Sequence, residues 1–225
     1  KWFFLSLSIV LLGLPFHLRV FSVGFSNDTI PKNANTLKVM SYNVRLFGYY
    51  SQPHSKAKQT RNDILSFIRK EDPEVLCLQE YFHQDGNGGF NTRDSIYNIM
   101  SINSHHEKSK YYPRKKTHFG ISLFSKFPII NKGVVHREGS IKENSNYCIF
   151  SDIVKNNDTI RVYNVHFQSI KLESDDYSRK TNNETNSQSQ RKKFTSVISK
   201  LNKAFKIRVN QSGLVSKHIQ DSPYK

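Results

Sequence analysis

Three polar residues with complementary chemistry stand at or near the ends of apolar, strand-like runs: Asn43, Glu80 and His166. They lie in the segments "SYNV", "CLQE" and "VYNVHFQS". A carboxylate can hold Mg²⁺ or Mn²⁺, an amide can bind a metal or a phosphate oxygen, and an imidazole can exchange a proton near neutral pH. If the three strands are neighbours, their ends converge on one cleft, as the active sites of sheet proteins tend to do.

Each of the three residues also has an ordinary structural explanation. An Asn at a strand end commonly caps a turn, a Glu there commonly faces solvent, and a lone His is commonly a satisfied core or rim residue. Asn43 needs a partner in either case, because a buried amide without hydrogen bonds costs roughly 1–3 kcal/mol. The residue types taken singly therefore leave both interpretations open.

Apolar periodicity predicts the elements that must position these residues. In chain order the sequence predicts a strand that starts at residue 37 and stops at Asn43, a helix within 55–72 that Asp72-Pro73 ends, and a strand at 74–80. A loop at 83–94 and a strand at 120–129, closed by Pro128, follow. The last elements are a hairpin within 146–169 that turns at 156–158, a loop at 169–190, and one or two amphipathic helices within 191–220. Strands alternate with helices early and then follow one another directly. That order favours a mixed sheet, or two sheets packed face to face with helices outside.

The N-terminal residues are apolar and differ from the rest of the chain. Residues 2–16, "WFFLSLSIVLLGLPF", contain two serines and no charge. Fifteen residues fall short of the roughly 20 that span a bilayer, and the chain begins with Lys rather than Met. We expect residues 1–25 to be the stump of a transmembrane helix, or else a signal-like segment, followed by a linker at 26–36. This predicts a membrane-anchored protein whose membrane contact is the N-terminal segment.

The formal net charge is +16 and the pI is about 9.8. This balance fits a partner that carries phosphate, such as nucleic acid or a phospholipid headgroup, or simply a lysine-rich solvated surface. Residues 108–116 are basic and contain Tyr111 and Tyr112, which suits a nucleic-acid backbone but also a protected strand edge. The two cysteines, Cys77 and Cys148, each lie in an apolar run and are predicted to be core residues.

Four segments, "LKVMSYNVR", "PEVLCLQE", "GISLFSKFPI" and "RVYNVHFQS", occur in the order and at roughly the spacing found in one enzyme family. From residue 37 to its last residue the chain resembles the endonuclease/exonuclease/phosphatase (DNase I-like) family. The resemblance implies an α/β fold, a four-layer α/β sandwich of two packed mixed β-sheets flanked by helices. Residues 37–225 are then the domain, preceded by the apolar N-terminal helix.

The resemblance also implies a role for each of the three polar residues. Asn43 lines the catalytic site and orients the scissile phosphate and its metal. Glu80 is the principal ligand of a catalytic Mg²⁺ (or Mn²⁺). His166 lies against the phosphate and acts in acid catalysis or in transition-state stabilisation. Hydrolysis of a phosphate ester needs a cation, a positioned water and a proton for the leaving oxygen, so these roles are chemically consistent.

The family's later motifs, Gly-Asp-Phe-Asn and Ser-Asp-His, do not occur in this sequence. We therefore expect an incomplete domain that lacks its C-terminal part and shows no appreciable activity alone, within a metal-dependent phosphoesterase. Its substrate, a nucleic acid or a lipid or sugar phosphate, is left open. The alternative is a non-catalytic, membrane-tethered binding module with a degenerate phosphoesterase fold.

Overall fold

A computed structural model describes residues 2–20, 35–86, 90–102, 104–135, 148–170 and 187–224. The chain divides into two compact units, Lys1–Thr36 and Leu37–Lys225. The first unit contains the helix α1 (Trp2–Val20), in which Pro15 lies. Among the residues that the structure describes, no helix has both the length and the apolar character needed to cross a bilayer, so the transmembrane prediction finds no support. Most of the predicted linker lies outside the described residues.

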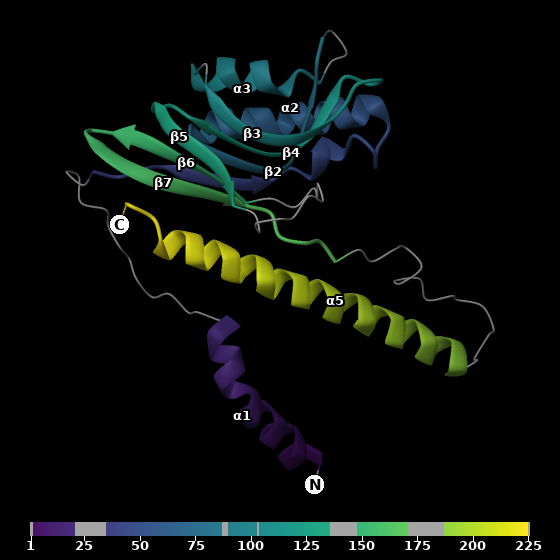
Figure 1. Ribbon diagram of the computed structural model, residues 1–225. Coiled ribbons are helices and arrows are strands. Elements are labelled where there is room, and N and C mark those ends of the chain that lie inside the picture. The colour runs from purple at the N-terminus through teal and green to yellow at the C-terminus, as the bar shows by residue number, and fades with distance from the viewer. Residues whose placement is uncertain are drawn as a thin grey trace. The chain divides into compact units, whose positions relative to one another are not determined.

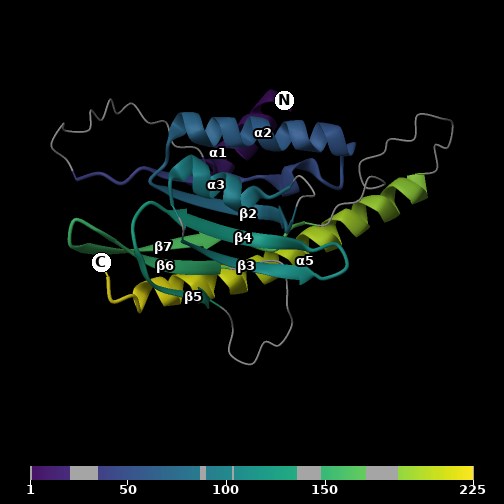
Figure 2. The same ribbon diagram turned by 90° about the horizontal axis from the view of Figure 1, so that it is seen from above.

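One sheet, sheet A, carries two of the three predicted site residues. Its strand order is β1-β2-β4-β3, with β1 parallel to β2 and the other neighbours antiparallel. Two helices cover one face of this sheet (Figures 1 and 2). The elements are β1 (Val39–Asn43), the short 3-10 turn η1 (Arg45–Gly48), α2 (His54–Glu71), β2 (Val75–Gln84), α3 (Thr92–Met100), β3 (His105–Tyr112) and β4 (Thr117–Ser125).

The second sheet, sheet B, packs on the other face of sheet A. It has the order β5-β6-β7, and its strands are β5 (Ile129–Val135), β6 (Cys148–Lys155) and β7 (Asp158–Val165). The long helix α5 (Ser187–Gln220) runs along its outer side (Figures 1 and 2). There the Tyr163 hydroxyl lies 2.8 Å from Nδ1 of His218, and Arg208 donates to the Gln168 carbonyl at 2.7 Å.

These layers confirm the predicted four-layer α/β sandwich: helices α2 and α3, sheet A, sheet B and α5. One part of the prediction was wrong, because both sheets were expected to be mixed. In the described strands sheet B is antiparallel throughout. The reason is local: a tight turn at Asn156 and Asn157 joins β6 to β7, and such a turn can only return the chain antiparallel. Both Asn residues have the positive φ that this turn requires.

Strand β2 lies in the middle of the sandwich and separates two hydrophobic layers. Leu76 and Leu78 face α2 and α3, whereas Val75 and Cys77 face sheet B. This explains the nearly unbroken apolar run that predicted a strand covered on both faces. Cys77 and Cys148 are free and buried, as predicted, and burial raises the pKa of each thiol to about 12.

The described elements η1, α3 and β5 were not expected from the sequence, and β3 was considered only as a protected strand edge. Helix α3 has only nine residues, too few for a clear helical period, and it begins inside the predicted loop at 83–94. β3 is a polar edge strand, so its alternation carries little apolar signal. Helix α5 is one continuous helix that begins at Ser187, within the predicted loop at 169–190.

A buried ionic cluster ties α3 to the edge strand β3. The Glu107 side chain is only 8% exposed, and its Oε2 lies 3.0 Å from Nη2 of Arg93 and 3.3 Å from Nε2 of His105. Ser109 also donates a hydrogen bond to this carboxylate. Burial by itself raises the pKa of Glu107, but the hydrogen bonds from His105 and Ser109 and the charge of Arg93 outweigh it and lower the pKa to about 2.

The first prediction concerns this cluster. Because the folded-state pKa of Glu107 lies below its ordinary value of 4.5, its stabilisation is complete above about pH 5 and is lost as the pH falls toward 2. We expect Glu107→Gln to lower the free energy of unfolding by about 2–3 kcal/mol at pH 7, and this difference from the parent chain to shrink on acidification. Urea unfolding at pH 7, 5 and 3 measures it.

The matched control is Glu71→Gln, since Glu71 forms an exposed pair with Lys38. It should change stability by less than about 0.5 kcal/mol. A Glu107→Gln deficit that stayed constant from pH 7 to pH 3 would show that the charge of Glu107 is not what stabilises the cluster.

Candidate active site

The ends of β1 and β7 meet the middle of β2 and bring the three predicted residues together; β2 does not end at Glu80, as the sequence predicted, but continues to Gln84. Asn43 closes β1, where it pairs with Gln79 of the neighbouring strand β2. Nδ2 of Asn43 donates to Oε1 of Glu80 at 3.1 Å. Nε2 of His166, the residue after β7, lies 3.6 Å from the same Glu80 oxygen. One oxygen of Glu80, on β2, thus lies between the Asn43 amide of β1 and the His166 imidazole, which follows β7.

A β-bulge in β2 directs Glu80 into this arrangement. Leu78 pairs with Ser122 of β4 and Tyr81 pairs with Gly120, so Gln79 and Glu80 together oppose a single residue. Glu80 has φ +48°, a left-handed conformation that a residue other than Gly seldom adopts. The Glu80 side chain is 32% exposed, whereas Gln79 is buried. The bulge therefore separates the two side chains, turning one inward and leaving the other at the surface.

Asn43 is exposed rather than buried as the sequence had suggested, and its side chain makes two hydrogen bonds. Its Oδ1 accepts a hydrogen bond from the backbone N–H of Arg45 at 3.0 Å, which caps the turn that follows β1. Its Nδ2 holds Glu80. The turn needs this cap, because Arg45, Leu46 and Phe47 all have positive φ values near +50°. The same amide thus fixes the local backbone and orients the carboxylate.

The side chain of Asn164, on β7, joins the two sheets directly beneath the bulge. It is 1% exposed, and its Nδ2 donates to the carbonyl oxygens of Leu78 at 3.0 Å and Ser122 at 2.8 Å. Its Oδ1 accepts from Nε2 of Gln79 at 2.6 Å, and that amide also reaches Oγ of Ser41 at 3.1 Å. Asn164 and Gln79 were not predicted from the sequence, although both are amides inside apolar strands, a pattern that indicates a buried polar network.

His166 retains unused hydrogen-bonding capacity. Its side chain is 16% exposed, and its Nδ1 is buried with no hydrogen-bond partner in the described part of the chain. Its Nε2 is too far from Glu80 for a direct hydrogen bond. An imidazole whose Nε2 lies this close to a carboxylate is a group that can transfer a proton.

The donor set suits a hard divalent cation that keeps most of its water. Glu80 supplies one carboxylate, and the Asn43 carbonyl has a second lone pair beside the one that Arg45 uses. Mg²⁺ is commonly held by one or two carboxylates together with water and substrate phosphate. Across the residues that the structure describes, no cluster of three or more His, Cys, Asp or Glu could form a closed metal site. The metal-binding and catalytic roles of these residues remain predictions.

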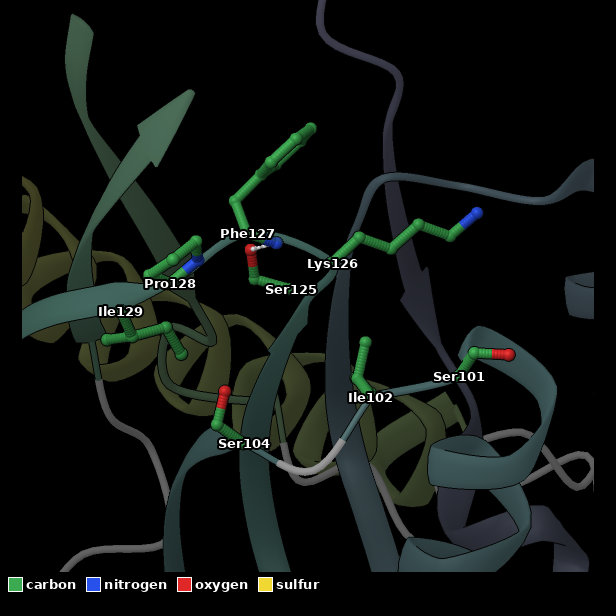
Figure 3. A pocket seen from close by; sticks show the side chains of 8 residues that line it. All are labelled: Ser101, Ile102, Ser104, Ser125, Lys126, Phe127, Pro128 and Ile129. Carbon is green, nitrogen blue, oxygen red and sulfur yellow. Dashed lines mark hydrogen bonds between the residues drawn. The ribbon is translucent and has the colours of Figure 1, made fainter. Parts of the chain in front are cut away.

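A separate pocket opens at the other end of β2 and does not belong to this site. It is lined by Ser125 to Ile129 on one side and by Ser101, Ile102 and Ser104 on the other (Figure 3). Ser125 pairs with Val75 at the start of β2, five residues before Glu80, which is about 16 Å along a strand. The polar side chains that line this pocket are serines and Lys126, and Lys126 already donates a hydrogen bond to Asp72 at 2.6 Å.

Comparison with known proteins identifies one family. The family model described as "Endonuclease/Exonuclease/phosphatase family" matches residues 40–192. Similar solved structures include a protein of that family from Leptotrichia buccalis, with 12% identity, 61% of this chain and 57% of that chain covered, and a TM-score of 0.43. TDP2 from C. elegans is 17% identical over 59% of this chain and 36% of that chain, with a TM-score of 0.42. SmcL is 14% identical over 63% of this chain and 52% of that chain, with a TM-score of 0.40.

The chain aligns with between about a third and somewhat over half of the length of these solved structures. No curated protein matches it.

The second prediction concerns the amide bridge between the sheets. Asn164→Leu has a similar volume but leaves two carbonyl oxygens and the Gln79 amide without their partner, so we expect a loss of about 2–4 kcal/mol in the free energy of unfolding. Chemical denaturation measures it. Asn98→Leu, at an exposed position of α3, is the control and should cost less than about 1 kcal/mol. A loss for Asn164→Leu no larger than for the control would mean that the bridge does not hold the sheets.

Proposed function

The chain belongs to the endonuclease/exonuclease/phosphatase family, and from that premise we propose that it is a metal-dependent phosphoesterase whose catalytic residues include Asn43, Glu80 and His166. The observation that carries the proposal is the contact of one Glu80 oxygen with Asn43 at 3.1 Å and its approach to His166 at 3.6 Å. A metal ligand, an orienting amide and a proton-exchanging group thus share one edge of the sandwich.

Each residue has a distinct part in the proposed reaction. Glu80 would hold Mg²⁺ (or Mn²⁺), which when bound neutralises the charge that develops on the phosphate. Asn43 fixes the direction of the Glu80 carboxylate through Nδ2. His166 donates a hydrogen bond to a phosphate oxygen or a proton to the leaving oxygen, and the position of its Nε2, 3.6 Å from Glu80, supports this use. No residue of the described chain is assigned to activate the attacking water.

The proposed substrate is a phosphate ester on a larger anionic molecule, a nucleic acid or a phospholipid in the first instance. The net charge of +16 supports it, because a strongly basic protein attracts polyanions. The second candidate function is a non-catalytic binding module. This second function needs the ligand-binding groups, Asn43 and Glu80, but no residue that activates water. It predicts ligand binding without turnover.

The third prediction tests the metal site without an activity assay. Glu80→Gln keeps the size of the side chain but replaces the carboxylate by a poorer ligand for a hard cation. We expect Mn²⁺ affinity to fall at least about 10-fold. Free Mn²⁺ has a six-line electron paramagnetic resonance spectrum that weakens on binding, so a titration of the 225-residue chain measures the affinity directly.

Glu71→Gln is the matched control for this titration. The Glu71 side chain is 37% exposed, close to the 32% of Glu80, but it lies at the end of α2. Its substitution should leave Mn²⁺ affinity within about twofold. Equal affinity in Glu80→Gln and the parent chain would remove Glu80 from the metal site.

The fourth prediction concerns His166 and uses a version of the chain extended to carry the family's two later motifs. His166→Ala should lower the Mg²⁺-dependent rate by roughly 10²–10⁴-fold on a substrate with an alkoxide leaving group. Metal affinity should change little. A nitrophenolate leaving group needs no proton, so it should recover part of the loss. Equal losses with both leaving groups would contradict a proton-donor role for His166.

A further inference from the structure

The β3–β4 hairpin carries an exposed aromatic and basic surface that the proposed chemistry does not use. Side chains alternate along a strand, so Lys110 and Tyr112 lie on one face of β3 and Tyr111 lies on the other. Lys110 pairs with Phe119 of β4, and Phe119 pairs with Phe82 of β2. These positions form a continuous row across three strands on the face that carries Lys110 and Tyr112.

Aromatic rings continue this row toward the segment that follows β1. The ring of Tyr112 stacks on Phe119 with centroids 4.8 Å apart and an interplanar angle of 13°. Tyr49 stacks on the buried ring of Phe82 at 4.2 Å, and Tyr50 meets Phe82 edge-on at 6.3 Å. We call this set, Tyr49, Tyr50, Phe82, Tyr112 and Phe119, the aromatic platform. Its most exposed rings are Tyr50, at 56%, and Tyr112, at 37%.

Cations border both exposed rings. Nζ of Lys110 lies 5.5 Å from the Tyr112 centroid, and Nζ of Lys115 lies 6.0 Å from the Tyr50 centroid. Residues 108–119 contain five Lys or Arg and no Asp or Glu. A long lysine stem can move its ammonium from the ring to a phosphate when a ligand arrives.

The hairpin is held in place rather than presented as a loose loop. The Asp85 N–H donates to the Lys116 carbonyl at 2.9 Å, and the Gln84 side chain donates to the Lys115 carbonyl at 3.2 Å. Gly120 permits the close pairing of β3 with β4, because a Cβ there would lie 2.0 Å from the Lys108 carbonyl oxygen. A rigid platform loses little entropy when it binds a ligand.

The platform borders the candidate active site through shared elements. Phe82 follows Glu80 by two residues on β2, and Tyr49 and Tyr50 follow Asn43 through the turn after β1.

We propose that the aromatic platform binds an unpaired nucleic-acid strand, with bases stacked at Tyr112 and Tyr50 and backbone phosphates at Lys110 and Lys115. Aromatic rings interleaved with cations are the means by which proteins hold single strands without reading sequence, because every base has a π-face and every linkage a charge. In naming the substrate class the proposal rests on the proposed function, but the binding itself needs no metal.

The test is fluorescence anisotropy of a labelled 15-residue oligothymidylate with the 225-residue chain in excess EDTA, at several salt concentrations. We expect binding that weakens as salt increases. Tyr112→Ala should weaken it about 5- to 30-fold, whereas Tyr112→Phe, which keeps the ring, should stay within about twofold. Lys110→Gln should lower the slope of log affinity against log salt by about 1.

Tyr111→Ala is the matched control, since Tyr111 is 46% exposed and lies on the opposite face of the same strand. It should change affinity less than about twofold. Three results would overturn the proposal: equal losses in Tyr111→Ala and Tyr112→Ala, tighter binding of a fully paired duplex than of the single strand, or Tyr112-dependent binding of phosphatidylserine vesicles with no binding of the oligonucleotide. Because EDTA excludes the metal, failure here leaves the Glu80 titration and the proposed function to be judged separately.

Discussion

The hydrogen bonds of one buried amide, Asn164, determine how the two sheets meet. Its Nδ2 satisfies the carbonyl oxygens of Leu78 and Ser122 at the bulge in β2, and its Oδ1 receives the Gln79 amide. A bulge interrupts the ladder and leaves backbone groups that a buried site must satisfy in another way. Because Glu80 is part of this bulge and His166 follows Asn164 by two residues, the same contacts hold the two candidate catalytic groups near each other.

The candidate site departs from ordinary local preferences at several residues. Glu80 has a left-handed backbone conformation, and so do Arg45, Leu46 and Phe47 in the turn after β1. Nδ1 of His166 is buried without a partner in the described chain. Such features persist when the surrounding structure fixes them, and they cluster at functional sites. Here the two hydrophobic layers and the Asn164 bridge provide that constraint.

The sequence predicted the parts that depend on local patterns. Four motifs predicted the family and the layered sandwich, and the run from Val75 to Leu78 predicted a strand buried on both faces. The bulge was not predicted: the strand was expected to end at Glu80, whereas β2 continues to Gln84 because β4 pairs with it on both sides of the bulge. Asn164 was missed because its partners lie between 42 and 86 residues away in the sequence. The roles of Asn43 and His166 stay predictions, since a contact does not reveal a reaction step.

The central claim is that Asn43, Glu80 and His166 form one cation and phosphate site. Anomalous diffraction from a crystal of the chain soaked in Mn²⁺ tests it most directly. The account predicts a peak within coordination distance of Glu80, about 2.2 Å, on the side shared with Asn43 and His166. A Mn²⁺ peak only at other carboxylates, with Glu80 turned away from Asn43, would contradict it.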